Sequence, residues 1–263
     1  MRSNAARAVL FLFWLSTSGC IASASSPGPE AVVSDLVALL HSPQPDTRRT
    51  AALSLGKIAL PESAAALIQT LRDPDPLVRQ YSAWALGNIG EYAPVETALA
   101  LAALLYDPLP DVMDTAAEAI GKMPASARVT ERVIEAVHDP RVTTRRAAVK
   151  ALRWMEASSA YDVLVQALKD PDAQVRQGAI AALGELGDRR AVTAMQDRLL
   201  HDSAVGVRSE AAYRLGKSGS LSMLPVLQRA VSGNAESSVE RWARWAIEQT
   251  RTDEPGSTIS PNQ

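Results

Sequence analysis

The chain contains the stretch Arg72-Asp-Pro-Asp-Pro-Leu-Val-Arg79, followed by Ala83-Trp-Ala-Leu-Gly-Asn-Ile-Gly90. The same pattern returns as Lys169-Asp-Pro-Asp-Ala-Gln-Val-Arg176, followed by Ala179-Ile-Ala-Ala-Leu-Gly-Glu-Leu-Gly187. Asp-Pro ends a helix in both stretches, because proline lacks an amide hydrogen and forces the residue before it out of the helical region. The second Asp is placed to cap the next helix, and Pro76 stands at its first position. The pattern therefore predicts a helical hairpin.

This hairpin pattern occurs seven times, at intervals of 31 to 34 residues. We number each unit from an anchor position, which follows the turn between the two helices and holds arginine in five units. The anchor residues are Arg48, Arg79, Met113, Arg145, Arg176, Arg208 and Glu240. The position eight residues later holds Gly56, Gly87, Gly121, Arg153, Gly184, Gly216 and Glu248. A short hairpin is not stable alone, whereas stacked neighbours bury its apolar stripe. We therefore predict an all-α fold, an α-solenoid of about seven stacked antiparallel helix pairs over residues 30–250.

The second helix of each unit has a face of small residues. Positions three, four, seven and eight after the anchor share one side of the helix, and small residues there let neighbouring helices approach to roughly 8 to 10 Å. Glycine inside a helix costs about 1 kcal/mol against alanine. Its five recurrences eight residues after the anchor therefore predict a packing role.

The two quoted stretches resemble HEAT-like repeats of the phycobilisome-lyase type, and the resemblance covers about residues 30–250. It implies that the second helices line a concave face. It also implies a ladder of ion pairs along the turns between helices, which we interpret as structural. The alternative is a set of solvated surface charges, each worth little. The ladder residues are Arg48, Arg79, Arg145, Arg176 and Arg208 with Asp73, Asp139, Asp170 and Asp202.

The opposite side of the second helices is the candidate binding face. Aromatic side chains recur there, two, five or nine residues after the anchor, and aromatic area with few rotamers is typical of protein-binding hot spots. The candidate partner-binding residues are Tyr81, Trp84, Lys150, Trp154, Tyr213, Trp242 and Trp245. Alternatively, the aromatic side chains fill gaps between unequal units. We expect a non-catalytic scaffold or adaptor that binds a protein or peptide partner on this face.

Enzymes are the second class that the resemblance implies, since HEAT-like proteins include bilin-attaching lyases and a hydroxylase whose di-iron site is held by His-Glu pairs. This chain has no His-Glu pair, and His41, His138 and His201 stand in separate units. At roughly 10 Å per unit they cannot share one metal ion, whose ligands lie within about 2 Å of it. No Ser-His-Asp or Cys-His arrangement and no phosphate loop appears. We predict no enzyme activity, cofactor or metal. The alternative is a bilin-lyase-like or hydroxylase-like enzyme subunit with a ligand pocket in the concave face.

Residues 1–19 are typical of a signal peptide, because basic residues precede an apolar run too short to span a membrane. The sequence Ser16-Thr-Ser-Gly-Cys20 resembles a bacterial lipobox, which would place a lipid on Cys20. Cleavage after Ala24 is the alternative. We expect an exported protein of the bacterial cell envelope, periplasmic or anchored to a membrane through Cys20. Residues 20–29 are predicted to be a flexible tether, and residues 251–263 a disordered tail.

The charge balance argues against nucleic acid as a partner, because the chain without Arg2 and Arg7 has 25 basic and 29 acidic residues. The repeat pattern breaks in the third unit, where Met113 replaces the anchor arginine and Met123-Pro124 replaces a glycine turn. Two interpretations remain open for residues 107–125, a hinge in the stack or tolerated drift of the repeat.

Overall fold

The computed structural model describes residues 28–124, 126–218, 220–233 and 237–252. In these ranges it contains fourteen α-helices and no strand. The first eight helices are α2 (Pro29–Leu39), α3 (Pro45–Ile58), α4 (Ala64–Thr70), α5 (Pro76–Ile89), α6 (Glu96–Ala103), α7 (Pro110–Gly121), α8 (Ala127–Val137) and α9 (Val142–Trp154). The others are α10 (Tyr161–Ala167), α11 (Ala173–Leu186), α12 (Val192–His201), α13 (Val205–Lys217), α14 (Leu224–Gly233) and α15 (Ser237–Thr252). The predicted all-α solenoid of seven helix pairs is confirmed.

The contacts between Cα atoms divide the chain into two compact units, Met1–Pro94 and Val95–Gln263. The described part of the first unit holds the pairs α2/α3 and α4/α5, and that of the second holds the five pairs from α6/α7 to α14/α15. The boundary between the units precedes the break in the repeat pattern. At that break α7 begins with Pro110, and Met113 is buried in the core of the second unit.

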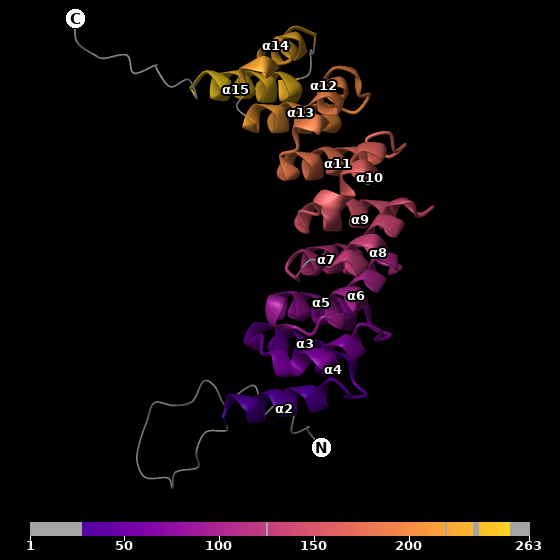
Figure 1. Ribbon diagram of the computed structural model, residues 1–263. Helices are drawn as coiled ribbons and strands as arrows, with labels where there is room; N and C mark the ends of the chain where they lie inside the picture. Colours follow the sequence, from indigo (N-terminus) through magenta and orange to yellow (C-terminus); the bar gives the residue numbers. More distant parts are fainter. Residues whose placement is uncertain (1–27, 125, 219, 234–236, 253–263) are drawn as a thin grey trace, which may run out of the picture. The chain divides into compact units, whose positions relative to one another are not determined.

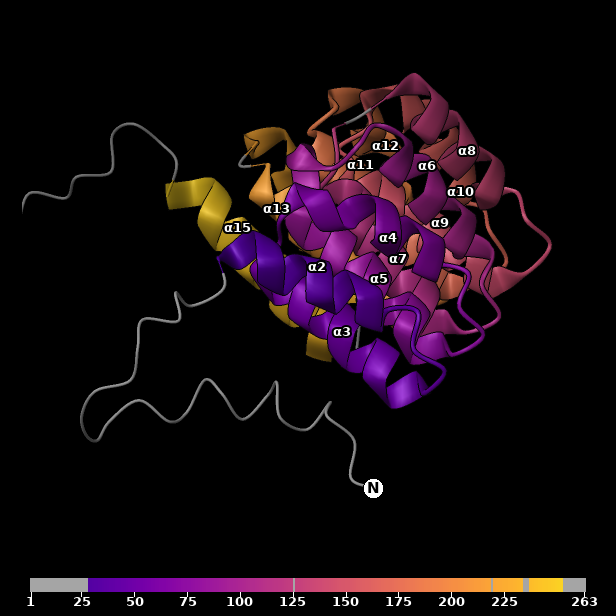
Figure 2. The ribbon, with the colours of Figure 1, turned by 90° about the horizontal axis from the view of Figure 1, so that it is seen from below.

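The second unit is built of two layers of helices. Its second helices α7, α9, α11, α13 and α15 pack on one another in chain order. The first helices α6, α8, α10 and α12 lie together on the other side, as both Figure 1 and Figure 2 show. Each second helix also packs on the first helix of its own pair. The buried alanine, leucine and valine side chains therefore lie between the layers and between successive second helices.

The N-termini of α5 and α11 are capped by aspartate side chains, as the sequence predicts. The Asp75 carboxylate accepts a hydrogen bond from Val78 N at 3.1 Å, and Pro76 occupies the first position of α5. Asp172 accepts hydrogen bonds from Gln174 N and Val175 N, both at 3.0 Å. These contacts satisfy amide groups that have no partner inside the helix.

The recurring glycines allow neighbouring second helices to approach closely. A Cβ atom added at Gly56 would lie 2.5 Å from the Trp84 ring, and one at Gly121 would lie 2.2 Å from the Trp154 Cβ. At Gly216 the added atom would lie 2.3 Å from the Ala246 Cβ. All three distances are shorter than van der Waals contact, so the predicted packing role of these glycines is confirmed.

Several sequence predictions concern the ends of the chain. The predicted leader, Cys20 and the alternative cleavage site at Ala24 lie outside the described residues, and so does the tail beyond Thr252. Helix α15 ends at Thr252, two residues inside the predicted tail. None of the described helices has the length and the apolar content that crossing a membrane requires.

Replacing Gly216 by alanine should destabilise the second unit, because the new methyl group overlaps Ala246 on α15. We expect the free energy of unfolding in urea to fall by about 1–3 kcal/mol, although alanine is the better helix former. Gly206→Ala is the matched control, since its added atom would meet only the flexible end of Gln177, at 3.2 Å. Equal stability of the Gly216 and Gly206 variants would contradict the packing role.

Candidate functional site

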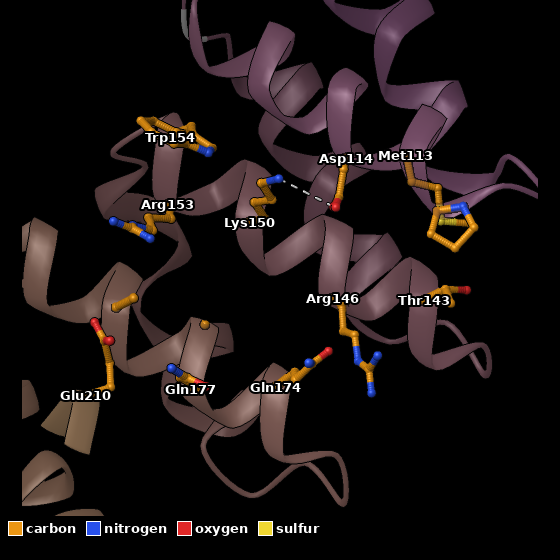
Figure 3. Close-up of a pocket in the computed structure, with 13 residues that line it drawn as sticks. Met113, Asp114, Thr143, Arg146, Lys150, Arg153, Trp154, Gln174, Gln177 and Glu210 are labelled. Atoms are coloured by element: carbon orange, nitrogen blue, oxygen red, sulfur yellow. Dashed lines mark ion pairs between the residues drawn. The ribbon is translucent and has the colours of Figure 1, made fainter. Parts of the chain in front are cut away.

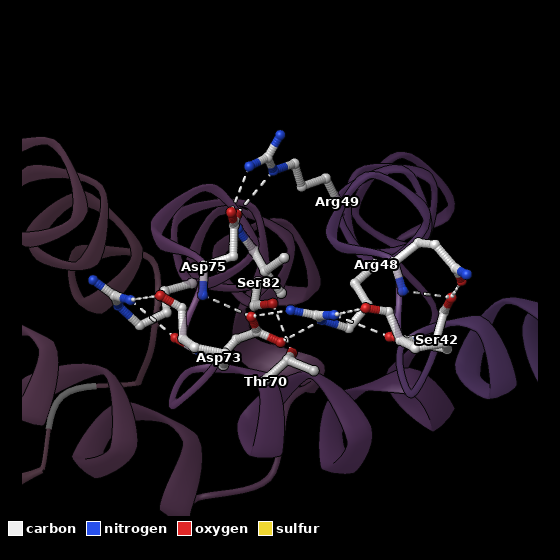
Figure 4. A network of polar contacts seen from close by, with 12 residues as sticks. Ser42, Arg48, Arg49, Thr70, Asp73, Asp75 and Ser82 are labelled. Carbon is white, nitrogen blue, oxygen red and sulfur yellow. Dashed lines mark hydrogen bonds and ion pairs between the residues drawn. The ribbon is translucent and has the colours of Figure 1, made fainter.

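The predicted ladder arginines connect successive hairpins. Arg48 donates from Nε and Nη2 to the two carboxylate oxygens of Asp73, each at 2.7 Å (Figure 4). Its Nη1 donates to the backbone carbonyl of Ser42 in its own turn at 3.0 Å. The same double contact joins Arg145 to Asp170 and Arg176 to Asp202. An anchor arginine therefore ties its own turn to the next hairpin.

A second ion pair, which the sequence analysis missed, runs beside the first. Arg49 donates from Nε to Asp75 Oδ1 at 2.8 Å, and Arg146 donates to Asp172 at 2.8 and 2.6 Å. The hydrogen bond from arginine, with help from the backbone amides that each carboxylate caps, lowers the pKa of both aspartates to about 2 despite their partial burial. The signal for this pair was the Arg-Arg dipeptide at the start of α3 and α9.

The remaining ladder residues have different contacts. Arg79 and Arg208 each donate to the backbone carbonyl six residues earlier, those of Asp73 and Asp202. Asp139 has Met113 instead of arginine in the preceding hairpin, and it pairs with Arg141 in its own turn at 2.9 Å. The hydrogen bond from Arg141 lowers the pKa of Asp139. At this turn Arg141 also donates from Nη1 to the Tyr106 carbonyl of the preceding hairpin at 3.2 Å, so a backbone carbonyl replaces the carboxylate in the link between the hairpins.

A cavity of about 520 Å³ opens on the exposed side of the second helices in the second unit (Figure 3). This volume lies in the range of small-molecule pockets. We call it the α9 groove, because α9 supplies the largest share of its side chains. It is lined by Pro110, Met113 and Asp114 of α7, Thr143, Arg146, Lys150, Arg153 and Trp154 of α9, Gln174, Gln177, Gly178 and Ala181 of α11, and Glu210 of α13.

Lys150 bridges two helices at the α9 groove. Its Nζ lies 2.9 Å from Glu118 Oε1 and 3.6 Å from Asp114 Oδ1, both on α7. The close-up shows Lys150 directed toward Asp114 (Figure 3). Both carboxylates are more than half exposed, so these pairs contribute little to stability.

Arg153 and Trp154 form the end of the α9 groove. Arg153 Nη2 donates to Glu185 Oε1 at 3.2 Å, and the guanidinium carbon lies 5.5 Å from the centre of the Trp154 ring. Glu185 also accepts from Arg214 at 2.7 Å, and the Arg214 hydrogen bond lowers the pKa of Glu185. Trp154 is 49% exposed, so a flat ring surface is open to a ligand.

The predicted partner-binding residues fall in three places. Lys150 and Trp154 line the α9 groove, whereas Tyr81 and Trp84 lie on α5 in the first unit, where the Trp84 ring covers Gly56. The other three, Tyr213, Trp242 and Trp245, form an aromatic cluster with ring centres 5.2 to 5.7 Å apart. All three rings of this cluster are partly exposed. Their binding role stays a prediction.

The floor of the groove was not predicted from the sequence. Gly178 and Ala181 stand two and five residues after the anchor on α11, and Ala181 is buried. Some other units carry aromatic side chains at these two repeat positions. A small residue at both positions was therefore the sequence signal that could have predicted the floor of the groove. Among the described residues, no group of three or more His, Cys, Asp or Glu side chains is placed to hold a metal ion.

Comparison with known proteins assigns the family. The model of HEAT repeats matches residues 33–102, 97–172 and 161–248, which together span most of the chain. The chain belongs to the HEAT-repeat family. The repeat resemblance stated from the two quoted stretches is confirmed.

One relative of this HEAT-repeat chain is phycocyanobilin lyase subunit alpha of Picosynechococcus sp. (strain ATCC 27264 / PCC 7002 / PR-6), 39% identical over 66 residues. That match spans a quarter of each protein. The complex of CpcE and CpcF of phycocyanin lyase from Nostoc sp. PCC7120 has a TM-score of 0.50 at 20% identity, covering 89% of this chain and 100% of that chain. Human deoxyhypusine hydroxylase has a TM-score of 0.41 at 23% identity, covering 86% of each chain. The two structural likenesses concern the HEAT-repeat fold alone.

The expectation of a non-catalytic scaffold is wrong, because the sequence relative is named as a lyase subunit. The expectation rested on missing catalytic motifs. In a HEAT-repeat protein most recurring positions serve stacking, whether the protein is a scaffold or part of an enzyme, so their composition does not separate the two classes. The relative favours the alternative, an enzyme subunit with a ligand pocket on the second helices.

Replacing Arg176 by alanine should lower stability strongly, because the side chain of Asp202 is only 1% exposed and would lose its main partner. Breaking a buried ion pair costs about 3–5 kcal/mol in the free energy of unfolding, measurable by urea denaturation. Arg132→Ala is the control, since Arg132 and Glu135 are both more than half exposed and their pair is worth at most about 1 kcal/mol. Equal losses in the two variants would contradict a structural ladder.

Stability should also fall in acid. Asp75 and Asp172 have pKa values of about 2 in the folded chain, below the ordinary value near 3.8. Their contribution to the free energy of unfolding is therefore complete above about pH 4, and it is lost as the pH falls from about 4 through 2. Thermal unfolding followed by circular dichroism should show this loss, and the double variant Asp75→Asn/Asp172→Asn should show a shallower one. A variant curve as steep as that of the wild type would exclude these two carboxylates as the cause.

Proposed function

We propose that this HEAT-repeat chain is an enzyme subunit of the bilin-lyase type that works with a second protein. The observation that carries the proposal is the 39% identity, over 66 residues, to a protein named as a phycocyanobilin lyase subunit. The Nostoc structure is a complex of CpcE and CpcF of phycocyanin lyase, which supports a protein partner for this chain as well.

The α9 groove supports a ligand-binding role. A bilin is a flat, conjugated molecule with carboxylate side chains. The exposed Trp154 ring offers a stacking surface for such a molecule, and Lys150 and Arg153 offer donors for its carboxylates. The only cysteine of the chain, Cys20, lies outside the described residues. The contribution that we assign to the groove is therefore binding and orientation of the bilin.

We place the protein partner on the aromatic cluster of Tyr213, Trp242 and Trp245. The cluster presents three partly exposed rings on α13 and α15. Arg241 and Arg244 are exposed on the same helix, α15, which gives the rings a polar border. A border of this kind around aromatic area is typical of protein interfaces.

The function is tested by reconstitution. The full chain, phycocyanobilin, an apo-phycocyanin subunit and a CpcF-type partner are mixed, and bilin bound covalently to the acceptor is detected by zinc-enhanced fluorescence after denaturing electrophoresis. We expect the adduct only when the chain and the partner are both present. Trp154→Ala should slow its formation roughly fivefold to tenfold, because it removes the stacking surface.

Tyr92→Ala is the matched control, because Tyr92 is a 72% exposed aromatic residue in the first unit. It should form the adduct at the wild-type rate. A wild-type chain that neither changes the absorption spectrum of phycocyanobilin nor promotes its attachment would refute the proposed function.

A further inference from the structure

A second cavity, of about 620 Å³, lies at the ends of α11 and α13, where the chain turns toward α12 and α14. Its volume is in the range of small-molecule pockets. Part of its wall is apolar, with Leu183, Val192 and Met223, and the rest carries charges and hydroxyl groups. We call this cavity the α13 pocket. It has no lining residue in common with the α9 groove.

Arg214 is the buried cation of the α13 pocket. Its side chain is only 5% exposed, and it lies over Gly184, where an added Cβ would be 2.5 Å from the Arg214 Cδ. Nε donates to Glu210 and Nη1 donates to Glu185, both at 2.7 Å. No residue that the structure describes accepts a hydrogen bond from Nη2. A guanidinium fixed by two glutamates therefore keeps one nitrogen available to a ligand.

Two further cations of the α13 pocket are accessible. Lys217 Nζ lies 3.8 Å from Glu185 Oε2, which is too far for a hydrogen bond, and its side chain is 56% exposed. Arg189, in the turn before α12, is exposed and forms no ion pair within the described part of the chain. The hydroxyl groups of Ser220 and Ser222, 2.7 Å apart, add donors from the turn before α14.

The carboxylates that line the α13 pocket already have arginine partners. Glu185 accepts from Arg214 and Arg153, and Asp188 accepts from Arg190 at 2.6 Å. Together with these partners and the glutamate on Arg214 Nε, the lining includes five cationic side chains and three carboxylates, a local charge of +2. This cationic surplus stands in a chain whose net charge is −2. The pocket therefore favours an anionic ligand.

The free donors fit a phosphate group better than a carboxylate. A carboxylate pairs best with two donors on one edge of a guanidinium, but on both edges of Arg214 that include Nη2 a glutamate already occupies the other donor. A phosphate monoester has three acceptor oxygens and a charge of about −1.5 to −2 at pH 7. It has one oxygen for each of Arg189, Arg214 and Lys217, and its charge balances the local surplus.

We propose that the α13 pocket binds a small organic phosphomonoester, with its phosphate at Arg189, Arg214 and Lys217 and its organic part against Val192 and Met223. The physical basis is a buried guanidinium with a free donor, two accessible cations and an apolar wall around one cavity. This site is independent of the proposed function, which uses the α9 groove and the aromatic cluster.

Isothermal titration calorimetry of the full-length chain with phenyl phosphate tests the proposal. We expect saturable binding, at least about tenfold tighter than that of benzoate, because benzoate has the same ring but only one charge and two acceptor oxygens. Inorganic phosphate should bind more weakly than phenyl phosphate, since it leaves the apolar wall in contact with water.

The double variant Arg189→Gln/Lys217→Gln should bind phenyl phosphate at least about tenfold more weakly, because it removes both accessible cations and leaves Arg214 with its glutamates. Both replaced side chains are exposed, so we expect the helicity of the wild type by circular dichroism. The matched control is Arg128→Gln/Lys169→Gln, which removes one arginine and one lysine that are exposed and lie outside the pocket. It should bind phenyl phosphate like the wild type.

The contrary outcomes are distinct. The absence of saturable binding of phenyl phosphate, or equal affinities of the two double variants, would overturn the site. Benzoate binding as tightly as phenyl phosphate would overturn the assignment of a phosphate, and inorganic phosphate binding as tightly would overturn the role of the apolar wall. The proposed function is tested separately, by the formation of the bilin adduct.

Discussion

Neighbouring second helices lie so close together that even one extra carbon atom does not fit between them at several positions. An added Cβ would lie 2.2 Å from the next helix at Gly121 and 2.3 Å from it at Gly216. This close approach buries the apolar stripe that a single hairpin would expose to water. It also brings the outer sides of α7, α9 and α11 together, so that one groove can draw its lining from several hairpins.

The polar turns hold the register of the stack. Arg48 and Arg176 each join two carbonyls of their own turn to a carboxylate of the next hairpin. Where Met113 replaces the anchor arginine, Asp139 pairs with Arg141, whose Nη1 donates to the Tyr106 carbonyl of the preceding hairpin. Lys150, whose Nζ contacts two carboxylates of α7, supplies a different link between the same helices on the exposed side.

Two irregular positions of the repeat lie at the α9 groove. Met113 replaces the arginine that five units carry at the anchor, Arg153 replaces the glycine that five units carry eight residues later, and both line the groove. Repeat positions that hold the same residue type in most units carry the residues that the stacking of the helices requires. Positions that depart from the repeat, without weakening the core, are where a binding site can be built into a regular stack.

The sequence by itself determined the hairpins, their number, the caps at Asp75 and Asp172 and the packing role of the glycines, because these follow from contacts within a few residues and from the repeat interval. The tertiary structure decided that Trp84 covers a glycine while Trp154 remains exposed, that Asp139 pairs locally, and that Ala181 lies at the floor of a cavity. These features depend on how residues about thirty positions apart meet across two helices, which depends on the size of both side chains. The function was misjudged for a related reason, since the residues that line the groove belong to four hairpins and form no motif along the chain.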